Sequence, residues 1–93
     1  MQIWANYPAH MGGEQVKNPD QQQQVSCLQS GGKLDYALDS DEHGGLRLVK
    51  VDREIGRSGW GVWGMSFWGD WNRYHATKDA ADAVRKAQEL VQQ

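Results

Sequence analysis

Residues 58–71, SGWGVWGMSFWGDW, constrain the fold of this chain more than any other stretch. They hold four of its five tryptophans, and glycines separate the indoles where core residues would be usual. Gly69-Asp70 lies between Trp68 and Trp71. A glycine-aspartate pair between two strand-like runs indicates a two-residue hairpin turn, because glycine supplies the positive φ that such a turn requires. The segment is therefore expected to form a β-hairpin.

This turn places Trp68 opposite Trp71 and Met65 opposite Tyr74. Side chains alternate across a strand, so the hairpin has two different faces. One face is mostly apolar and is expected to pack on a helix, with Trp63 in the core: Trp63, Met65, Phe67, Asn72 and Tyr74. The other face is expected to be accessible: Trp60, Val62, Ser66, Trp68, Trp71, Arg73 and His75.

The rest of the chain predicts an α+β fold. Short strands are expected over residues 2–7, 25–29, 33–38 and 46–55, and in 33–38 the residues Leu34, Tyr36 and Leu38 share one face. An amphipathic helix is expected over residues 77–91, with Thr77 as its N-cap. Its apolar stripe is Ala80, Ala83, Val84, Ala87, Leu90 and Val91. The prediction is an antiparallel sheet of four to five strands with one C-terminal helix packed on one face.

Chain length and the positions of proline and glycine indicate how this fold is organised. A chain of 93 residues fits a single domain over residues 1–93. Residues 8–24 contain two prolines, two glycines and a run of four glutamines without apolar periodicity, so they are expected to form a flexible loop. Residues 39–45 read as a polar turn between strands.

Cysteine usage and hydropathy suggest a compartment. Cys27 is the single cysteine, which excludes an intramolecular disulfide and fits a reducing environment. It is expected to be a buried, inert thiol. The first residues show no signal-peptide pattern, and no apolar run reaches the roughly 20 residues that a membrane span needs. A cytoplasmic protein without membrane contact is the expectation.

The charge is weakly asymmetric. The formal net charge is −2. Residues 1–45 carry two basic and six acidic side chains, a net of −4, and residues 46–93 carry eight basic and six acidic, a net of +2. This balance lacks the strongly basic footprint of a duplex-DNA binder.

No motif points to catalysis or a metal. Residues 39–44 resemble the start of a calcium loop, but Lys50 falls where a glutamate is required. His10, His43 and His75 have no metal-ligand spacing with one another or with Cys27. No glycine-rich phosphate loop precedes a helix. We therefore expect no enzyme activity, no cofactor and no metal.

The expected binding site is the accessible hairpin face, with Trp60, Trp68, Trp71, Arg73 and His75. An exposed aromatic patch is typical of binding sites. The leading hypothesis is a small interaction or inhibitor protein that blocks a larger protein partner, of the kind that phages and mobile elements encode. The alternatives are a single-stranded nucleic-acid binder that stacks bases on indoles, and a carbohydrate-binding module or small enzyme. Homodimerisation through the aromatic face is compatible with each class.

Overall fold

The computed structural model describes residues 2–38, 45–54, 56 and 58–92. Six strands form one antiparallel sheet in the order β2-β1-β3-β4-β5-β6. The strands are β1 (Gln2–Asn6), β2 (Gln15–Lys17), β3 (Lys33–Ala37), β4 (Leu46–Arg53), β5 (Trp60–Ser66) and β6 (Trp71–Thr77). The helices are the short 3-10 helix η1 (Ala9–Met11), α1 (Gln21–Gln29) and α2 (Ala80–Val91).

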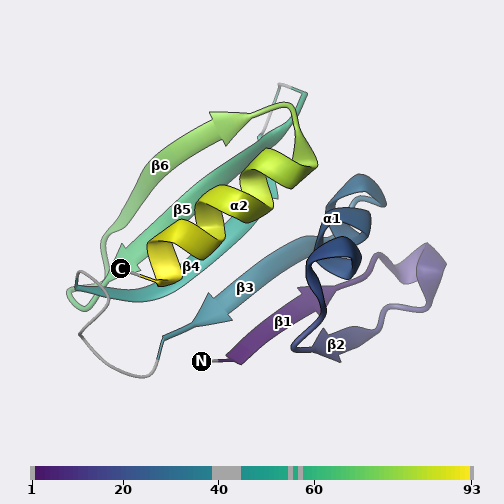
Figure 1. The fold of residues 1–93 in the computed structure, drawn as a ribbon, viewed down its shortest axis with the longest axis horizontal. Helices are drawn as coiled ribbons and strands as arrows, with labels where there is room; N and C mark the ends of the chain where they lie inside the picture. The colour runs from purple at the N-terminus through teal and green to yellow at the C-terminus, as the bar shows by residue number, and fades with distance from the viewer. Residues whose placement is uncertain (1, 39–44, 55, 57, 93) are drawn as a thin grey trace.

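The α+β class, the antiparallel sheet and the C-terminal helix on it are confirmed (Figure 1). The sheet has six strands instead of four to five, and the described chain has a second α-helix. Both additions lie in the N-terminal part, where strand β2 and helix α1 precede β3.

Both helices cover the same face of the sheet. Helix α1 contacts β1 and β3, α2 contacts β4, β5 and β6, and the two helices contact each other (Figure 1). Their buried side chains and those of the sheet form one hydrophobic cluster. No described element covers the opposite face, which is termed the open face below. An asymmetric two-layer arrangement of this kind leaves half of the sheet surface to water or a partner.

The expected periodicities hold where the apolar pattern is clear. Leu34, Tyr36 and Leu38 are all buried on the helix-covered face. All six residues of the predicted helix stripe are buried as well. Three small alanines on this stripe let α2 lie close to the sheet.

The prediction of a loop over residues 8–24 is wrong. Strand β2 pairs with β1, and α1 begins at Gln21 inside the glutamine run. Asp20 caps this helix: its side chain accepts from the N–H of Gln23, and the Gln23 side chain accepts from the N–H of Asp20. Such a reciprocal capping box satisfies two free donors at the first turn. Gln24 is buried, and its amide oxygen accepts a 2.7 Å bond from the Tyr36 hydroxyl.

The strand expected over residues 25–29 is also wrong, because these residues complete α1. Cys27 is buried as expected, although in a helix. Helix α2 begins three residues later than expected, at Ala80, and its N-cap is Asp79, which accepts from the N–H of Ala81. Thr77 instead ends β6, and its hydroxyl accepts from the N–H of Asp79.

The polar turn and the calcium-like pattern expected from residue 39 onward lie mostly outside the described residues. In the described part of the chain, no helix is long and apolar enough to span a membrane.

Candidate binding face

The turn of the β5–β6 hairpin is longer than the sequence indicates. Residues 67–70, termed the hairpin tip, connect Ser66 to Trp71. The N–H of Ser66 donates to the carbonyl of Asp70, and the Ser66 hydroxyl accepts from the N–H groups of Trp68 and Asp70. Gly69 takes a φ of +91° within this turn. The prediction of a two-residue turn at Gly69-Asp70 is therefore wrong.

The longer turn changes the strand register. Met65 pairs with Trp71 and Trp63 with Arg73, and Tyr74 is an extra residue in a bulge before Val62 pairs with His75. Relative to the expected pairing, the register at the tip is displaced by three residues, because Met65 was expected opposite Tyr74. An odd displacement exchanges the two faces of a strand. The face assignment predicted for the hairpin is consequently reversed along β5.

This reversal divides the five predicted site residues. Trp60 is only 8% exposed and belongs to the core under the helices. His75 faces α2, where its Nε2 lies 2.8 Å from Oδ2 of Asp82. Trp71 and Arg73 lie on the open face, and Trp68 projects from the hairpin tip with 90% exposure. The predicted single cluster is therefore wrong in geometry, and Trp63, predicted as core, is half-buried on the open face.

An apolar row crosses the open face next to the hairpin tip. Successive strand pairs join Ala37 to Leu48, Leu48 to Met65 and Met65 to Trp71. These four residues are termed the apolar row. Since Met65 and Trp71 form the last pair before the turn, the row continues into Phe67, which is 44% exposed, and Trp68. The sequence reasoning missed Met65 and Phe67 as surface residues because it placed their side chains on the helix-covered face, and it assigned no face to Leu48.

A second row, termed the charged row, crosses the whole open face beside the apolar row. Each member pairs with the next across the sheet, from one edge to the other. The row is Lys17, Trp4, Asp35, Lys50, Trp63 and Arg73. Only the pairing of all six strands reveals this row, since its members are scattered along the chain from residue 4 to residue 73 and no local sequence pattern connects them.

Cations of the charged row lie beside indoles of both rows. Lys50 Nζ lies 4.6 Å from the ring centre of Trp71 and 5.9 Å from that of Trp63. The Arg73 guanidinium lies 6.0 Å from the Trp63 ring and donates to the Glu54 carboxylate at 2.7 Å. Cation–π contacts within about 6 Å of a ring centre are attractive by about 0.5–1 kcal/mol at exposed sites. Trp63 and Trp71 thus each have a cation beside the ring, while no cation of the described residues lies over Trp68.

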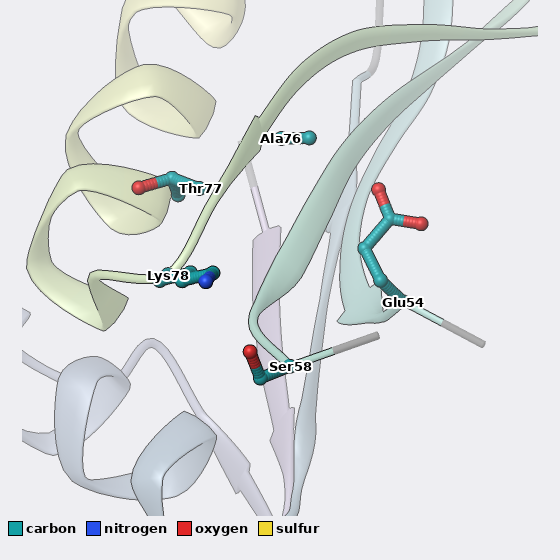
Figure 2. A pocket seen from close by; sticks show the side chains of 5 residues that line it. All are labelled: Glu54, Ser58, Ala76, Thr77 and Lys78. Atoms are coloured by element: carbon teal, nitrogen blue, oxygen red, sulfur yellow. The ribbon is translucent and has the colours of Figure 1, made fainter. Parts of the chain in front are cut away.

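A hollow of about 510 Å³ lies at the other end of β6, far along the strand from the hairpin tip. Figure 2 shows Glu54 on one side and Ser58, Thr77 and Lys78 on the other, with Ala76 between them. Among the described residues, no hydrogen bond joins two of these side chains, and the Glu54 carboxylate is taken by Arg73. The hollow therefore shows no nucleophile held by a base.

Two titratable groups are shifted by their surroundings. The hydrogen bond to His75, followed by the one to Arg85, lowers the pKa of the Asp82 carboxyl well below its ordinary value. Burial raises the pKa of the Cys27 thiol, which keeps it protonated and unreactive. Among the described residues, no group of three or more histidine, cysteine, aspartate or glutamate side chains is placed to hold a metal ion.

No protein-family model, curated protein or solved structure shows significant similarity to this chain.

Proposed function

We propose that this chain is a non-enzymatic interaction protein that binds a larger protein through the hairpin tip and the apolar row. The observation that carries the proposal is Trp68, an indole 90% exposed on a turn that several hydrogen bonds hold in place. Leaving so large a ring in water has no benefit for folding. Tryptophan on a rigid support is the residue most enriched at the energetic centres of protein interfaces.

The surroundings of Trp68 have the composition of a protein interface. Phe67, Met65 and Trp71 supply contiguous apolar surface, and Lys50, Arg73 and Asp70 lie around it. An apolar centre with a charged rim is the usual anatomy of such interfaces. The binding mode would be steric: the domain occupies a surface that its partner needs. An origin in a phage or mobile element agrees with the small size.

Charge makes single-stranded nucleic acid the weaker candidate. The open face carries four cations, Lys17, Lys33, Lys50 and Arg73, against three carboxylates, Asp35, Asp52 and Glu54. Base stacking also requires free ring faces, and Lys50 and Arg73 already lie over the indoles of Trp63 and Trp71. The open face is nearly neutral, and its own cations already lie over two of its indole rings. These properties suit a protein partner better than a polyanion.

The test compares baits that differ at one indole. Immobilised wild type and Trp68→Ala are exposed to nuclease-treated extract of the organism that encodes the chain, and bound proteins are quantified by mass spectrometry. We expect one larger protein to be retained by the wild type and reduced at least about tenfold by Trp68→Ala, because an interfacial tryptophan contributes about 2 kcal/mol or more to binding. Thermal melts of both baits should agree, since Trp68 buries little surface on folding.

Trp4→Ala is the matched control, because it removes an indole from the opposite end of the open face. It should leave retention unchanged. Equal loss with both variants would show non-specific adsorption to exposed indoles. A parallel arm uses untreated extract, and proteins retained from it but absent after nuclease treatment would favour the nucleic-acid candidate.

A further inference from the structure

The two edges of the sheet are built differently. Strand β2 has three residues, contains Lys17 and is followed by Pro19, and each of these features discourages pairing with another strand. Strand β6 has seven residues without lysine or proline. It lies at the outer rim of the sheet, and no described element pairs with its free side (Figure 1). The β6 edge is therefore the one that remains open to a further strand.

Main-chain groups of the β6 edge point outward near the hairpin tip. The Ser66 N–H donates to the Asp70 carbonyl, so these two residues stand at a hydrogen-bonded position of the ladder, although the Asp70 N–H donates to the Ser66 hydroxyl. Hydrogen-bonded and non-hydrogen-bonded pairs alternate in an antiparallel ladder. Trp71 and Arg73 accordingly form the other type of pair with β5, and their N–H and C=O groups face away from the sheet. Such groups are the donors and acceptors that pair with the main chain of an extended segment, and neither a nucleotide nor a sugar presents such a ladder.

Large rings stand on both sides of this edge. Trp71 is 40% exposed on the open face. Tyr74 is 44% exposed, and its ring lies over Gly64 on the helix-covered side, 2.7 Å from where a Cβ of Gly64 would stand. A strand added beside β6 would therefore find an aromatic neighbour for side chains on each of its faces.

Charge on β6 is already balanced within the chain. Arg73 pairs with Glu54 at 2.7 Å, and His75 pairs with Asp82 at 2.8 Å. An acidic or basic segment would be partly dehydrated beside β6 without gaining an ion pair with a free charge on this strand. An uncharged segment has no such cost. Electrostatic complementarity thus selects a neutral, apolar segment.

The bulge at Tyr74 limits the length of pairing. A bulge bends an edge strand and interrupts its ladder. The regular stretch is Trp71–Arg73, which begins directly after the hairpin tip. A segment that pairs there lies next to Trp68, so one partner can cover both surfaces.

We propose that the β6 edge accepts an extended, uncharged, proline-free segment of a protein partner as a seventh strand beside Trp71–Arg73. This rests on the proposed function, because it specifies how the protein partner binds. Strand addition to a sheet edge derives affinity from main-chain hydrogen bonds and selectivity from alternate side chains.

The test uses a phage-displayed library of random heptapeptides as the probe, selected on the wild-type protein. We expect the selected peptides to be free of proline, uncharged and apolar at alternate positions. Binding of a synthetic copy should slow amide hydrogen exchange at Trp71 and Arg73. Tyr74→Lys places a charge on the edge and removes one ring, and it should weaken peptide binding at least tenfold. Gln15→Lys places the same charge on the β2 edge and should have no effect.

Several outcomes would overturn the proposal. These are recovery of no peptide, selection of charged peptides, and binding that Tyr74→Lys leaves intact. Peptides that are lost with Trp68→Ala but leave the β6 amides unchanged would overturn the strand addition and leave the proposed function standing. Sedimentation of the protein alone as a dimer, with Trp71 and Arg73 amides already protected, would assign the edge to a second copy of this chain.

Discussion

At the scale of single residues, the alternation of side chains along β5 decides which indole belongs to the core, because Trp60 and Trp63 are an odd number of residues apart and face opposite sides of the sheet. Trp60 faces the helices and is almost fully buried, and Trp63 lies on the open face. Gly61 makes room for the second ring, because a Cβ at Gly61 would stand 2.8 Å from Trp63 Nε1. Gly61 thus allows the Trp63 ring to lie against the sheet.

The two indoles should respond very differently to the same substitution. Trp60→Ala removes a buried ring and should cost about 3–5 kcal/mol of unfolding free energy, a large share of the stability of a small domain. Trp63→Ala removes a half-buried ring and should cost clearly less. Urea denaturation followed by circular dichroism measures both. Equal losses, or a larger loss for Trp63→Ala, would contradict the face assignment.

At the scale of elements, Gly32 controls how closely α1 approaches the sheet. A Cβ at this position would stand 2.3 Å from the carbonyl oxygen of Asn6 and 2.5 Å from Cys27 Sγ. Gly32→Ala forces the helix and β1 apart and should cost about 1–3 kcal/mol, as overpacking does. Gln29→Ala is the control, because this side chain is exposed on the same helix and its truncation adds no atom to the contact between α1 and β1. Denaturation curves that rank the control below Gly32→Ala in stability would refute this packing.

The contact between β6 and α2 predicts a dependence on pH. Asp82 has its pKa lowered in the folded state, first by His75 and then by Arg85. A carboxyl with a lowered pKa stabilises the fold above its ordinary value of 3.8, and this stabilisation is lost as the pH falls through the folded pKa. Asp82→Asn should therefore be less stable than the wild type at about pH 5, and the difference should shrink toward about pH 2.

Denaturation at several pH values measures this difference, with Asp70→Asn on the hairpin tip as the matched control. The effect should be modest, since Asp82 is partly exposed to water. A difference that is constant or grows on acidification would show that the charged form of Asp82 does not stabilise the fold.

The elements also show what the sequence could predict. Strand β3 and the stripe of α2 follow from apolar periodicity alone, because alternate or helically spaced side chains there share one environment. Helix α1 has a weak apolar pattern, so only the Asp20 and Gln23 capping box marked its start. The hairpin register depended on whether the Ser66 hydroxyl closes a four-residue turn. Local composition does not decide this, and a single odd displacement exchanges the faces of β5 relative to β6, which here moves Trp60 into the core and Trp63 onto the open face.

At the scale of the whole molecule, the placement of both helices on one face explains where binding is expected. The core takes Trp60, and the open face keeps Trp4, Trp63 and Trp71 under cations, with Trp68 beyond them on the tip. The sheet thus separates indoles that stabilise the fold from one indole that has no partner of its own among the described residues.

The overall charge then separates the two leading binding modes. With a net charge of −2 and a nearly balanced open face, the protein should bind a 20-residue oligothymidylate more weakly than about 0.1 mM near physiological salt. Fluorescence anisotropy over a range of salt concentrations measures this, with Lys50→Gln as the variant that removes the central cation. Micromolar binding whose log–log salt slope is about −2, equivalent to roughly three phosphate contacts at −0.7 each, and which Lys50→Gln makes shallower, would establish the open face as a nucleic-acid surface. Protein binding through the desolvated Trp68 should instead vary little with salt, because screening acts mainly on exposed charges.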